Sequence, residues 1–135
     1  MKSLLLFLCL AATTAAAPLD IQRFLNALAQ VETGARWDGR PGPAGELSAW
    51  QIRKETWRQH TGAPFRLAAT NAALAEVIAI EHITWLELEL GRRGLPVTPA
   101  AVATCWNGGL GRAGQWSDFG QRVENLYRAA ALAQK

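Results

Sequence analysis

The chain of 135 residues carries 14 lysines and arginines against 11 aspartates and glutamates, which gives a formal net charge of +3. This small excess is spread along the chain without a basic run. It therefore argues against a nucleic-acid-binding protein and is compatible with an anionic polymer as partner. No group of histidines, cysteines and carboxylates has the spacing of metal ligands, so we expect neither a metal nor another cofactor.

The first 17 residues are typical of a signal peptide. A positively charged start is followed by an apolar run over residues 4–10 and by small residues that end in Ala15-Ala16-Ala17. The apolar run is too short to span a bilayer as a stable anchor. We therefore expect cleavage between Ala15 and Ala17, export to the periplasm or the cell exterior, and a single domain over residues 18–135. Because only Cys105 would then remain, no intramolecular disulfide is expected.

Apolar residues at helical spacing predict a first helix from about Asp20, a suitable N-cap, to Thr33. The following residues, 34–49, are rich in glycine and proline, which predicts a loop with room for a small hairpin. A short helix over about residues 53–60 is then expected to stop at Gly62-Ala63-Pro64.

The second half of the chain predicts three more helices. Residues 71–93 form the longest, and because apolar residues cover most of its circumference we expect it to be the buried central helix. Thr98-Pro99 opens the next helix, which runs to about Trp106, and the glycine-rich residues 107–111 predict a loop. The last helix begins near Ser117. The fold class expected from these elements is mainly α.

Glu32 is placed unusually for a carboxylate, because it continues the apolar stripe of the first helix four residues beyond Leu28. A carboxylate on a face meant for the core costs free energy unless it is paired, neutralised or used. Near the helix C-terminus the macrodipole also disfavours negative charge. Both effects raise the pKa of the carboxyl, as a general acid working near neutral pH requires. The alternative is that Glu32 is an ordinary surface residue of the last turn.

Four short motifs follow one another in the order and spacing of a known enzyme family. They lie at residues 32–34 (E-T-G), 45–51 (G-E-L-S-A-W-Q), 105–111 (C-W-N-G-G-L-G) and 119–123 (F-G-Q-R-V). These resemble, in turn, the E-S-G, G-A-x-G-L-x-Q, A-Y-N-A-G-x-G and Y-V-x-x-V segments of the lysozyme-like lytic transglycosylases. The spacing from Glu32 through residues 53–57 also resembles the invertebrate-type lysozymes and their bacterial relatives.

The resemblance implies a lysozyme-like helical fold and cleavage of the β-1,4 bond between N-acetylmuramic acid and N-acetylglucosamine in peptidoglycan. In a lytic transglycosylase one carboxylate, here Glu32, donates its proton to the leaving oxygen. It then acts as a base while the muramic C6 hydroxyl attacks the anomeric carbon, which leaves a 1,6-anhydro end. A hydrolytic lysozyme normally needs a second carboxylate. Glu46 is the candidate for that role, and the alternative is that Glu46 is a solvated turn residue.

Amide and aromatic side chains in the motifs are candidates for binding the glycan. Gln51 and Asn107 can hydrogen-bond an N-acetyl group, or can instead brace and cap their own loops. Aromatic rings stack on sugar faces, although most tryptophans of a small helical domain belong to the core. Of the six tryptophans in the chain, we expect Trp50 or Trp106 near the cleft.

The chain departs from the family pattern at three positions that bear on the site. Ser48 stands where the family has a glycine, Glu46 where it has an alanine, and Phe119 where the family tyrosine leans over the catalytic acid. Phenylalanine cannot donate a hydrogen bond, so Tyr127, eight residues further on, is considered as a substitute. The candidate substrate-binding residues are Ser48, Trp50, Gln51, Trp106, Asn107 and Tyr127.

Two rival functions belong to other classes. A cysteine hydrolase would use Cys105 with His60 or His82, but Cys105 lies on a predicted buried helix and neither histidine carries a local signature. A non-catalytic peptidoglycan-binding protein would have little reason to keep an acid at Glu32. We therefore rank a peptidoglycan-cleaving enzyme first and the binder second. We expect the enzyme to be a metal-independent monomer, with glycan strands as its partner and no nucleic acid or stable membrane anchor.

Overall fold

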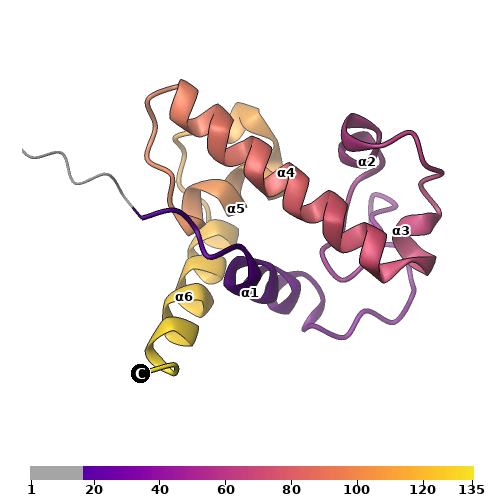
Figure 1. Ribbon diagram of the computed structural model, residues 1–135, viewed down its shortest axis with the longest axis horizontal. Helices are drawn as coiled ribbons and strands as arrows, with labels where there is room; N and C mark the ends of the chain where they lie inside the picture. The colour runs from indigo at the N-terminus through magenta and orange to yellow at the C-terminus, as the bar shows by residue number, and fades with distance from the viewer. Residues whose placement is uncertain (1–16) are drawn as a thin grey trace, which may run out of the picture.

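The computed structural model describes residues 17–135, and this part of the chain is mainly helical (Figure 1). The predicted signal peptide lies almost entirely outside the described residues. Within residues 17–135, β pairing is limited to one isolated antiparallel bridge between Leu47 and Ile52. None of the described helices is both long and apolar enough to cross a membrane. The elements are α1 (Ile21–Thr33), α2 (Lys54–His60), α3 (Leu67–Thr70), α4 (Ala72–Arg92), α5 (Pro99–Gly108), the 3-10 helix η1 (Leu110–Arg112) and α6 (Asp118–Leu132).

The first helix, α1, begins and ends where its capping residues predict. The Asp20 carboxylate accepts a hydrogen bond from the backbone N–H of Arg23 at 3.0 Å, which caps the N-terminus. Gly34 follows the last turn with φ +63°, the left-handed conformation that favours glycine. Between these ends Phe24, Leu25 and Leu28 are buried against the rest of the core. The apolar stripe therefore fixes the orientation of α1, and with it the direction in which the last turn presents Glu32.

The longest helix, α4, crosses the molecule diagonally and packs against α1, α2, α3 and α5 (Figure 1). Its inner face buries Ile78, Ile83 and Leu90. The expectation of burial around most of the circumference holds only in part, because Val77 and Leu88 are 48% and 57% exposed. They share an exposed stripe with Glu81 and Thr84, at helical spacing. Apolar residues on both faces of the helix hid this solvent-facing stripe from the sequence pattern.

The last two long helices, α5 and α6, make the closest helix pair in the molecule, and α6 also packs on α1. A Cβ atom at Gly120 would overlap the backbone oxygen of Ala100 and the hydroxyl of Thr104, so glycine allows this close crossing. The cap predicted at Thr98 is confirmed, since its side chain accepts from the N–H of Ala101, and Ser117, where the last helix was expected to begin, accepts from the N–H of Gly120.

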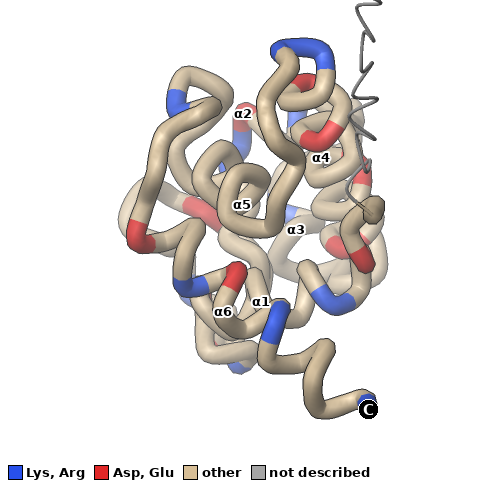
Figure 2. The backbone as a smooth tube through the Cα atoms, turned by 90° about the vertical axis from the view of Figure 1, so that its left-hand side faces the viewer, with Lys and Arg blue, Asp and Glu red and all other residues tan. Residues whose placement is uncertain are grey.

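Three details of the loops differ from the prediction. The short helix α3 lies in a stretch that the apolar pattern left as a connection. Residues 107 and 108, predicted to be loop, form the last turn of α5, and η1 follows after Gly109. Asn107 is therefore held on a helix end rather than on a free loop. Charged residues of both signs are distributed over the elements (Figure 2), in keeping with the even charge pattern of the sequence.

Candidate functional site

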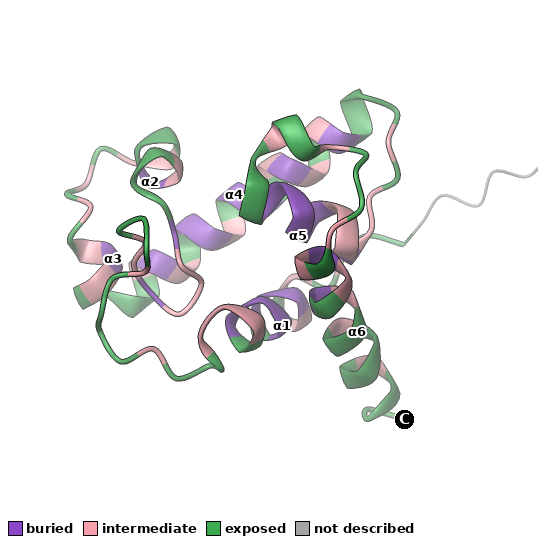
Figure 3. Ribbon diagram, turned by 180° about the vertical axis from the view of Figure 1, so that it is seen from behind, coloured by how far each residue is buried: buried purple, intermediate pink, exposed green. Residues whose placement is uncertain are grey.

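A polar cleft of about 280 Å³ opens between the C-terminal end of α1, the segment that joins α1 to α2, and the C-terminal end of α5. In Figure 3 the buried residues gather on α1, α4 and α5, whereas the joining segment over residues 34–53 is mostly half-buried or exposed. The core elements thus form one wall of the cleft and the joining segment forms the other. The lining residues are Glu32, Pro43, Glu46, Gln51, Arg53, Trp106 and Asn107.

Glu32 projects into this cleft from the last turn of α1 and is half-buried. Among the described residues, no group forms an ion pair or a hydrogen bond with its carboxyl. The pKa of Glu32 is raised from the ordinary value of 4.5 to about 7, chiefly by burial and to a smaller extent by the negative charge of Glu46. The positive charges of Arg53 and Arg122 partly oppose this rise in pKa. Glu32 is therefore an acid whose protonated form is still substantially populated near neutral pH.

Glu46 and Gln51 are held by a tight turn of the joining segment. One oxygen of Glu46 accepts a hydrogen bond from the N–H of Ala44 at 2.8 Å, and the Gln51 amide donates to the Ser48 carbonyl oxygen at 2.9 Å. A Cβ atom at Gly42 would overlap both the Glu46 carboxylate and the Gln51 amide oxygen. The absence of a side chain at Gly42 thus lets the backbone lie directly over these two polar groups.

The turn itself has an uncommon backbone. Ser48 and Gln51 have backbone φ angles of +78° and +52°, in a region that residues other than glycine rarely adopt. Glycine is the residue that this conformation favours. Two backbone hydrogen bonds between Leu47 and Ile52, at 3.0 and 2.8 Å, close the turn around these strained residues. Strain of this kind persists only where surrounding structure imposes it and is frequent at functional sites.

Two tryptophans and one arginine fasten the walls of the cleft together. The Trp106 indole N–H donates to the Trp50 carbonyl oxygen, and the Trp50 indole N–H donates to the Leu25 carbonyl oxygen, each at 3.2 Å. On the other side, Arg53 Nη2 donates to the carbonyl oxygen of Asn107 at 2.8 Å. The joining segment is thus tied to both α1 and α5.

The structure brings together five of the predicted site residues: Glu32, Glu46, Gln51, Trp106 and Asn107 all line the cleft. Ser48 and Trp50 support the cleft from behind instead of lining it. Ser48 is only 3% exposed, and its hydroxyl accepts a hydrogen bond from the N–H of Trp50 at 3.3 Å. Both residues therefore have a structural role in the turn, and contact of their side chains with the glycan stays a prediction.

Tyr127 lies away from the cleft, contrary to the expectation that it substitutes for the family tyrosine. Its hydroxyl accepts a hydrogen bond from the N–H of Asp20 at 2.9 Å, at the opposite end of α1 from Glu32. The physical reason is the direction of α6. Eight residues of helix separate Phe119 from Tyr127 by about 12 Å along the axis, and α6 packs on α1 so that Arg122 lies near Glu32 whereas Tyr127 reaches Asp20.

Two arginines near Glu32 were missed at the level of sequence. Arg53 lines the cleft directly, and Arg122 approaches Glu32 from α6. Arg53 could have been suspected because it follows the turn that carries Gln51. Arg122 carries no local signal, since its position depends on the packing of α6 against α1.

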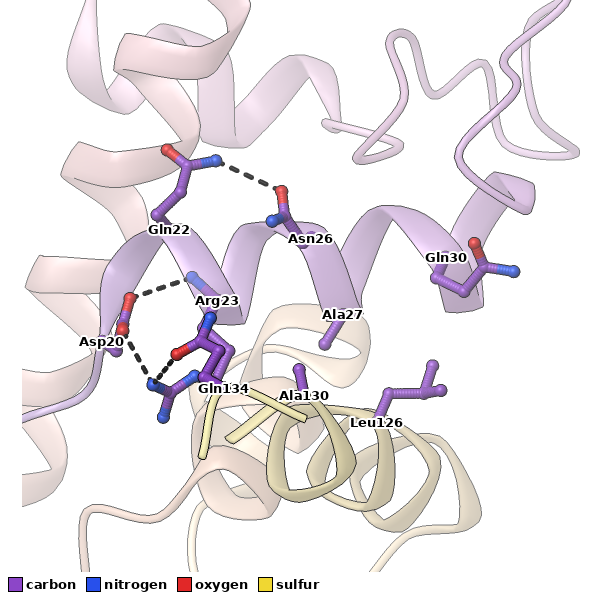
Figure 4. A pocket seen from close by; sticks show the side chains of 9 residues that line it. All are labelled: Asp20, Gln22, Arg23, Asn26, Ala27, Gln30, Leu126, Ala130 and Gln134. Atoms are coloured by element: carbon purple, nitrogen blue, oxygen red, sulfur yellow. Dashed lines mark hydrogen bonds and ion pairs between the residues drawn. The ribbon is translucent and has the colours of Figure 1, made fainter. Parts of the chain in front are cut away.

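A larger hollow, of about 370 Å³, lies between α1 and the C-terminal half of α6 (Figure 4). Its central charge is Arg23, whose guanidinium lies 3.2 Å from a carboxylate oxygen of Asp20 and donates to the Gln134 side chain at 3.2 Å. The guanidinium also lies over the Tyr127 ring, 5.1 Å from its centre. The charge here is used within the protein, so we place the candidate site at the cleft around Glu32.

Cys105 and the two histidines do not form a nucleophilic pair. Cys105 is 1% exposed, and burial raises the pKa of its thiol, which opposes formation of the nucleophilic thiolate. His60 Nε2 and His82 Nδ1 are hydrogen-bonded to each other at 2.9 Å, and the His82 ring stacks on Trp85. Within residues 17–135, no three histidines, cysteines or carboxylates are grouped as metal ligands.

No protein-family model matches the chain, and neither the curated proteins nor the solved structures contain a significant match to it.

Proposed function

We propose that this protein cleaves the β-1,4 bond between N-acetylmuramic acid and N-acetylglucosamine in peptidoglycan, as a lytic transglycosylase of lysozyme-like fold. The observation that carries the proposal is the position of Glu32, an unpaired and half-buried acid with a pKa of about 7 at a polar cleft. Glycoside cleavage needs such an acid at the leaving oxygen. Peptidoglycan is proposed as the substrate because the four sequence motifs resemble those of peptidoglycan-cleaving enzymes.

In the proposed reaction Glu32 acts twice. Its protonated carboxyl first donates the proton to the glycosidic oxygen as the bond to the anomeric carbon of the muramic residue breaks. The resulting carboxylate then takes the proton of the C6 hydroxyl while that oxygen bonds to the same carbon. Glu32 ends the cycle protonated, and the product carries a 1,6-anhydro ring. The amides of Gln51 and Asn107 are suited to hydrogen-bond the N-acetyl groups.

A hydrolytic lysozyme is the second candidate, and Glu46 is the specific observation that favours it. Glu46 lines the same cleft as Glu32, and its negative charge raises the pKa of Glu32. It could stabilise a cationic transition state or activate a water molecule. One of its oxygens already accepts a hydrogen bond from Ala44, however, so Glu46 is also well explained as part of the turn. The resemblance in four ordered motifs makes the transglycosylase our first choice.

Mass spectrometry of a peptidoglycan digest tests the proposal. A transglycosylase releases 1,6-anhydromuramic ends, which are lighter by one water molecule than the reducing ends left by a hydrolase. Reducing ends without anhydro ends, lost again in Glu46→Gln, would replace the first candidate by the second. Retention on peptidoglycan without release of soluble fragments would reject both and leave a binding protein. The expected export to the cell envelope belongs to the same proposal, since the substrate lies there.

A further inference from the structure

We propose that Arg53 binds a carboxylate on the muramic residue whose bond is cut, and so makes the enzyme select acidic glycan over uncharged glycan of similar backbone. This inference rests on the proposed function and adds the charge of the substrate to it. Muramic acid differs from N-acetylglucosamine by a lactyl group at C3. That group carries a free carboxylate in strands without peptide, whereas in peptide-bearing strands the nearest carboxylates belong to the stem peptide.

Arg53 presents its charge in the cleft itself. It is the N-cap residue of α2, its side chain lines the cleft with Glu32 and Glu46, and the residue is exposed. One of its five N–H donors is used by the carbonyl oxygen of Asn107 at 2.8 Å. No carboxylate of the described residues lies within 4.0 Å of its nitrogens. The guanidinium is therefore oriented by the protein at one edge and open to an anion at others.

The contrast with Arg23 supports a ligand role for this charge. The guanidinium of Arg23 is paired with Asp20, bonded to Gln134 and placed over the Tyr127 ring, and its buried Nε has no hydrogen-bond partner among the described residues. Arg53 receives only a carbonyl oxygen, although it faces a cleft with two acidic residues. A guanidinium fork pairs with a carboxylate through two parallel hydrogen bonds, a geometry that a carbonyl oxygen cannot supply.

Arg53 also lies close enough to Glu32 for its charge to lower the pKa of that acid. An anion bound by Arg53 would consequently lie on the sugar beside the bond that Glu32 protonates. The lactyl group is attached to the same sugar ring as the anomeric carbon that is attacked. Among the described groups, Glu46 is the other carboxylate that faces this position and Arg122 the other cation near Glu32.

The test compares two variants on matched substrates. Arg53→Gln removes the charge from the cleft, and Arg122→Gln is the control, because Arg122 also lowers the pKa of Glu32 but does not line the cleft. The substrates are peptide-free glycan strands, the same strands with the lactyl carboxyl converted to a neutral methylamide, peptide-bearing strands, and a chitin oligosaccharide. The measurement is kcat/KM for each pair, at a pH below 6 where Glu32 is protonated in all variants.

We expect the parent enzyme to prefer a carboxylate-bearing strand over the methylamide by about 10- to 100-fold, as one charge-assisted pair typically provides. Arg53→Gln should abolish this preference, with little further loss on the methylamide, and Arg122→Gln should keep it. If only peptide-free strands are preferred over the methylamide, the lactyl carboxylate is the group that Arg53 binds. If only peptide-bearing strands are preferred, the bound carboxylate belongs to the stem peptide. Either result supports the inference.

Equal loss on all substrates in Arg53→Gln would overturn the inference, because it would make Arg53 only a strap to Asn107. If Arg53→Gln fails to fold, the parent enzyme still tests the carboxylate contact, through its kcat/KM on carboxylate-bearing strands compared with the methylamide strands. A parent that cleaves the methylamide strands as well as both kinds of carboxylate-bearing strand overturns the carboxylate contact while leaving the proposed function intact. A parent that cleaves no muramic glycan at all rejects the proposed function instead.

Discussion

The two ends of α1 both hold an ionisable residue at a hollow in the surface, but only one of them has an ion-pair partner within the described part of the chain. At the N-terminal end, Arg23 is paired with Asp20, bonded to Gln134 and placed over an aromatic ring (Figure 4). At the C-terminal end, about 14 Å away from Arg23 along the helix, Glu32 has no ion pair within the described part of the chain. The larger hollow is therefore not the better candidate for chemistry.

The difference shows how a structural charge is told from a functional one. A paired charge at a helix end is held by its partners within the protein and contributes to the stability of the fold. An unpaired, half-buried carboxyl instead costs stability whenever it ionises, which is the condition that raises the pKa of Glu32 to about 7. The following substitutions, at the cleft around Glu32 and at the N-terminal end of α1, test whether only the cleft is functional. They are given in order of decreasing expected effect on activity.

Replacement of the acid itself should have the largest effect. Glu32→Gln keeps the size and hydrogen-bonding reach of the side chain but removes the transferable proton. We expect peptidoglycan cleavage to fall by about 10²- to 10⁴-fold or more, as for other essential general acids. Release of soluble fragments measures the loss. Residual activity within tenfold of the parent would exclude Glu32 as the acid.

The same variant should become more stable than the parent at high pH. The pKa of Glu32 is about 7 in the folded protein against 4.5 ordinarily, so between these values the folded state holds a proton that the unfolded state has lost. The stabilising contribution of Glu32 protonation is present below pH 4.5 and is lost as the pH rises to about 7. Glu32→Gln removes this dependence. After allowance for partial exposure, we expect a gain of order 1 kcal/mol in the free energy of unfolding above pH 7, measured by urea denaturation.

A methyl group at Gly42 should disturb the cleft more than the fold. A Cβ atom there would overlap the ends of the Glu46 and Gln51 side chains, which can swing aside. We expect Gly42→Ala to change the free energy of unfolding by less than about 1 kcal/mol, and to lower kcat/KM about tenfold or more because the cleft residues are displaced. Gly62→Ala is the matched control, since nothing lies within 4 Å of a Cβ atom there. Equal kinetics in the two variants would contradict the cleft assignment.

The sequence predicts the helices well because each is defined by local signals. The apolar stripe and the caps Asp20, Thr98 and Ser117 place α1, α5 and α6 where the structure has them. The stripe also indicates Glu32, since a carboxylate on the core face is anomalous whatever the tertiary structure. α3 was missed because four residues are too few for a helical period to appear.

The cleft residues are only partly predictable, because motifs mark the backbone of a turn as well as the surface of a site. Ser48 belongs to a motif yet is buried, and its positive φ shows that this position shapes the backbone of the turn. Arg122 and Tyr127 illustrate the other limit. Both lie on α6, and only the path of α6 along α1 decides which of them reaches Glu32.

Removal of the second carboxylate should shift the pH dependence of cleavage. The negative charge of Glu46 raises the pKa of Glu32, so Glu46→Gln should lower that pKa. The acid form of Glu32 is then lost at lower pH, and the high-pH limb of kcat/KM should move down by a fraction of a pH unit. Arg122→Gln should move the same limb upward, because Arg122 lowers the pKa of Glu32. If the high-pH fall in kcat/KM shifted in the same direction in Glu46→Gln and Arg122→Gln, this electrostatic account would be contradicted.

At the other end of α1, loss of the Tyr127 hydroxyl should leave catalysis unchanged. Tyr127→Phe removes the acceptor of the Asp20 N–H, a solvent-exposed hydrogen bond of 2.9 Å, while the ring remains beneath Arg23. We expect a loss of about 0.5–1 kcal/mol in the free energy of unfolding, with kcat and KM on peptidoglycan within twofold of the parent. Chemical denaturation and the fragment-release assay measure the two quantities. A severalfold rise in KM without a change in stability would instead place the Tyr127 hydroxyl in contact with the glycan, and the N-terminal end of α1 would then belong to the binding surface.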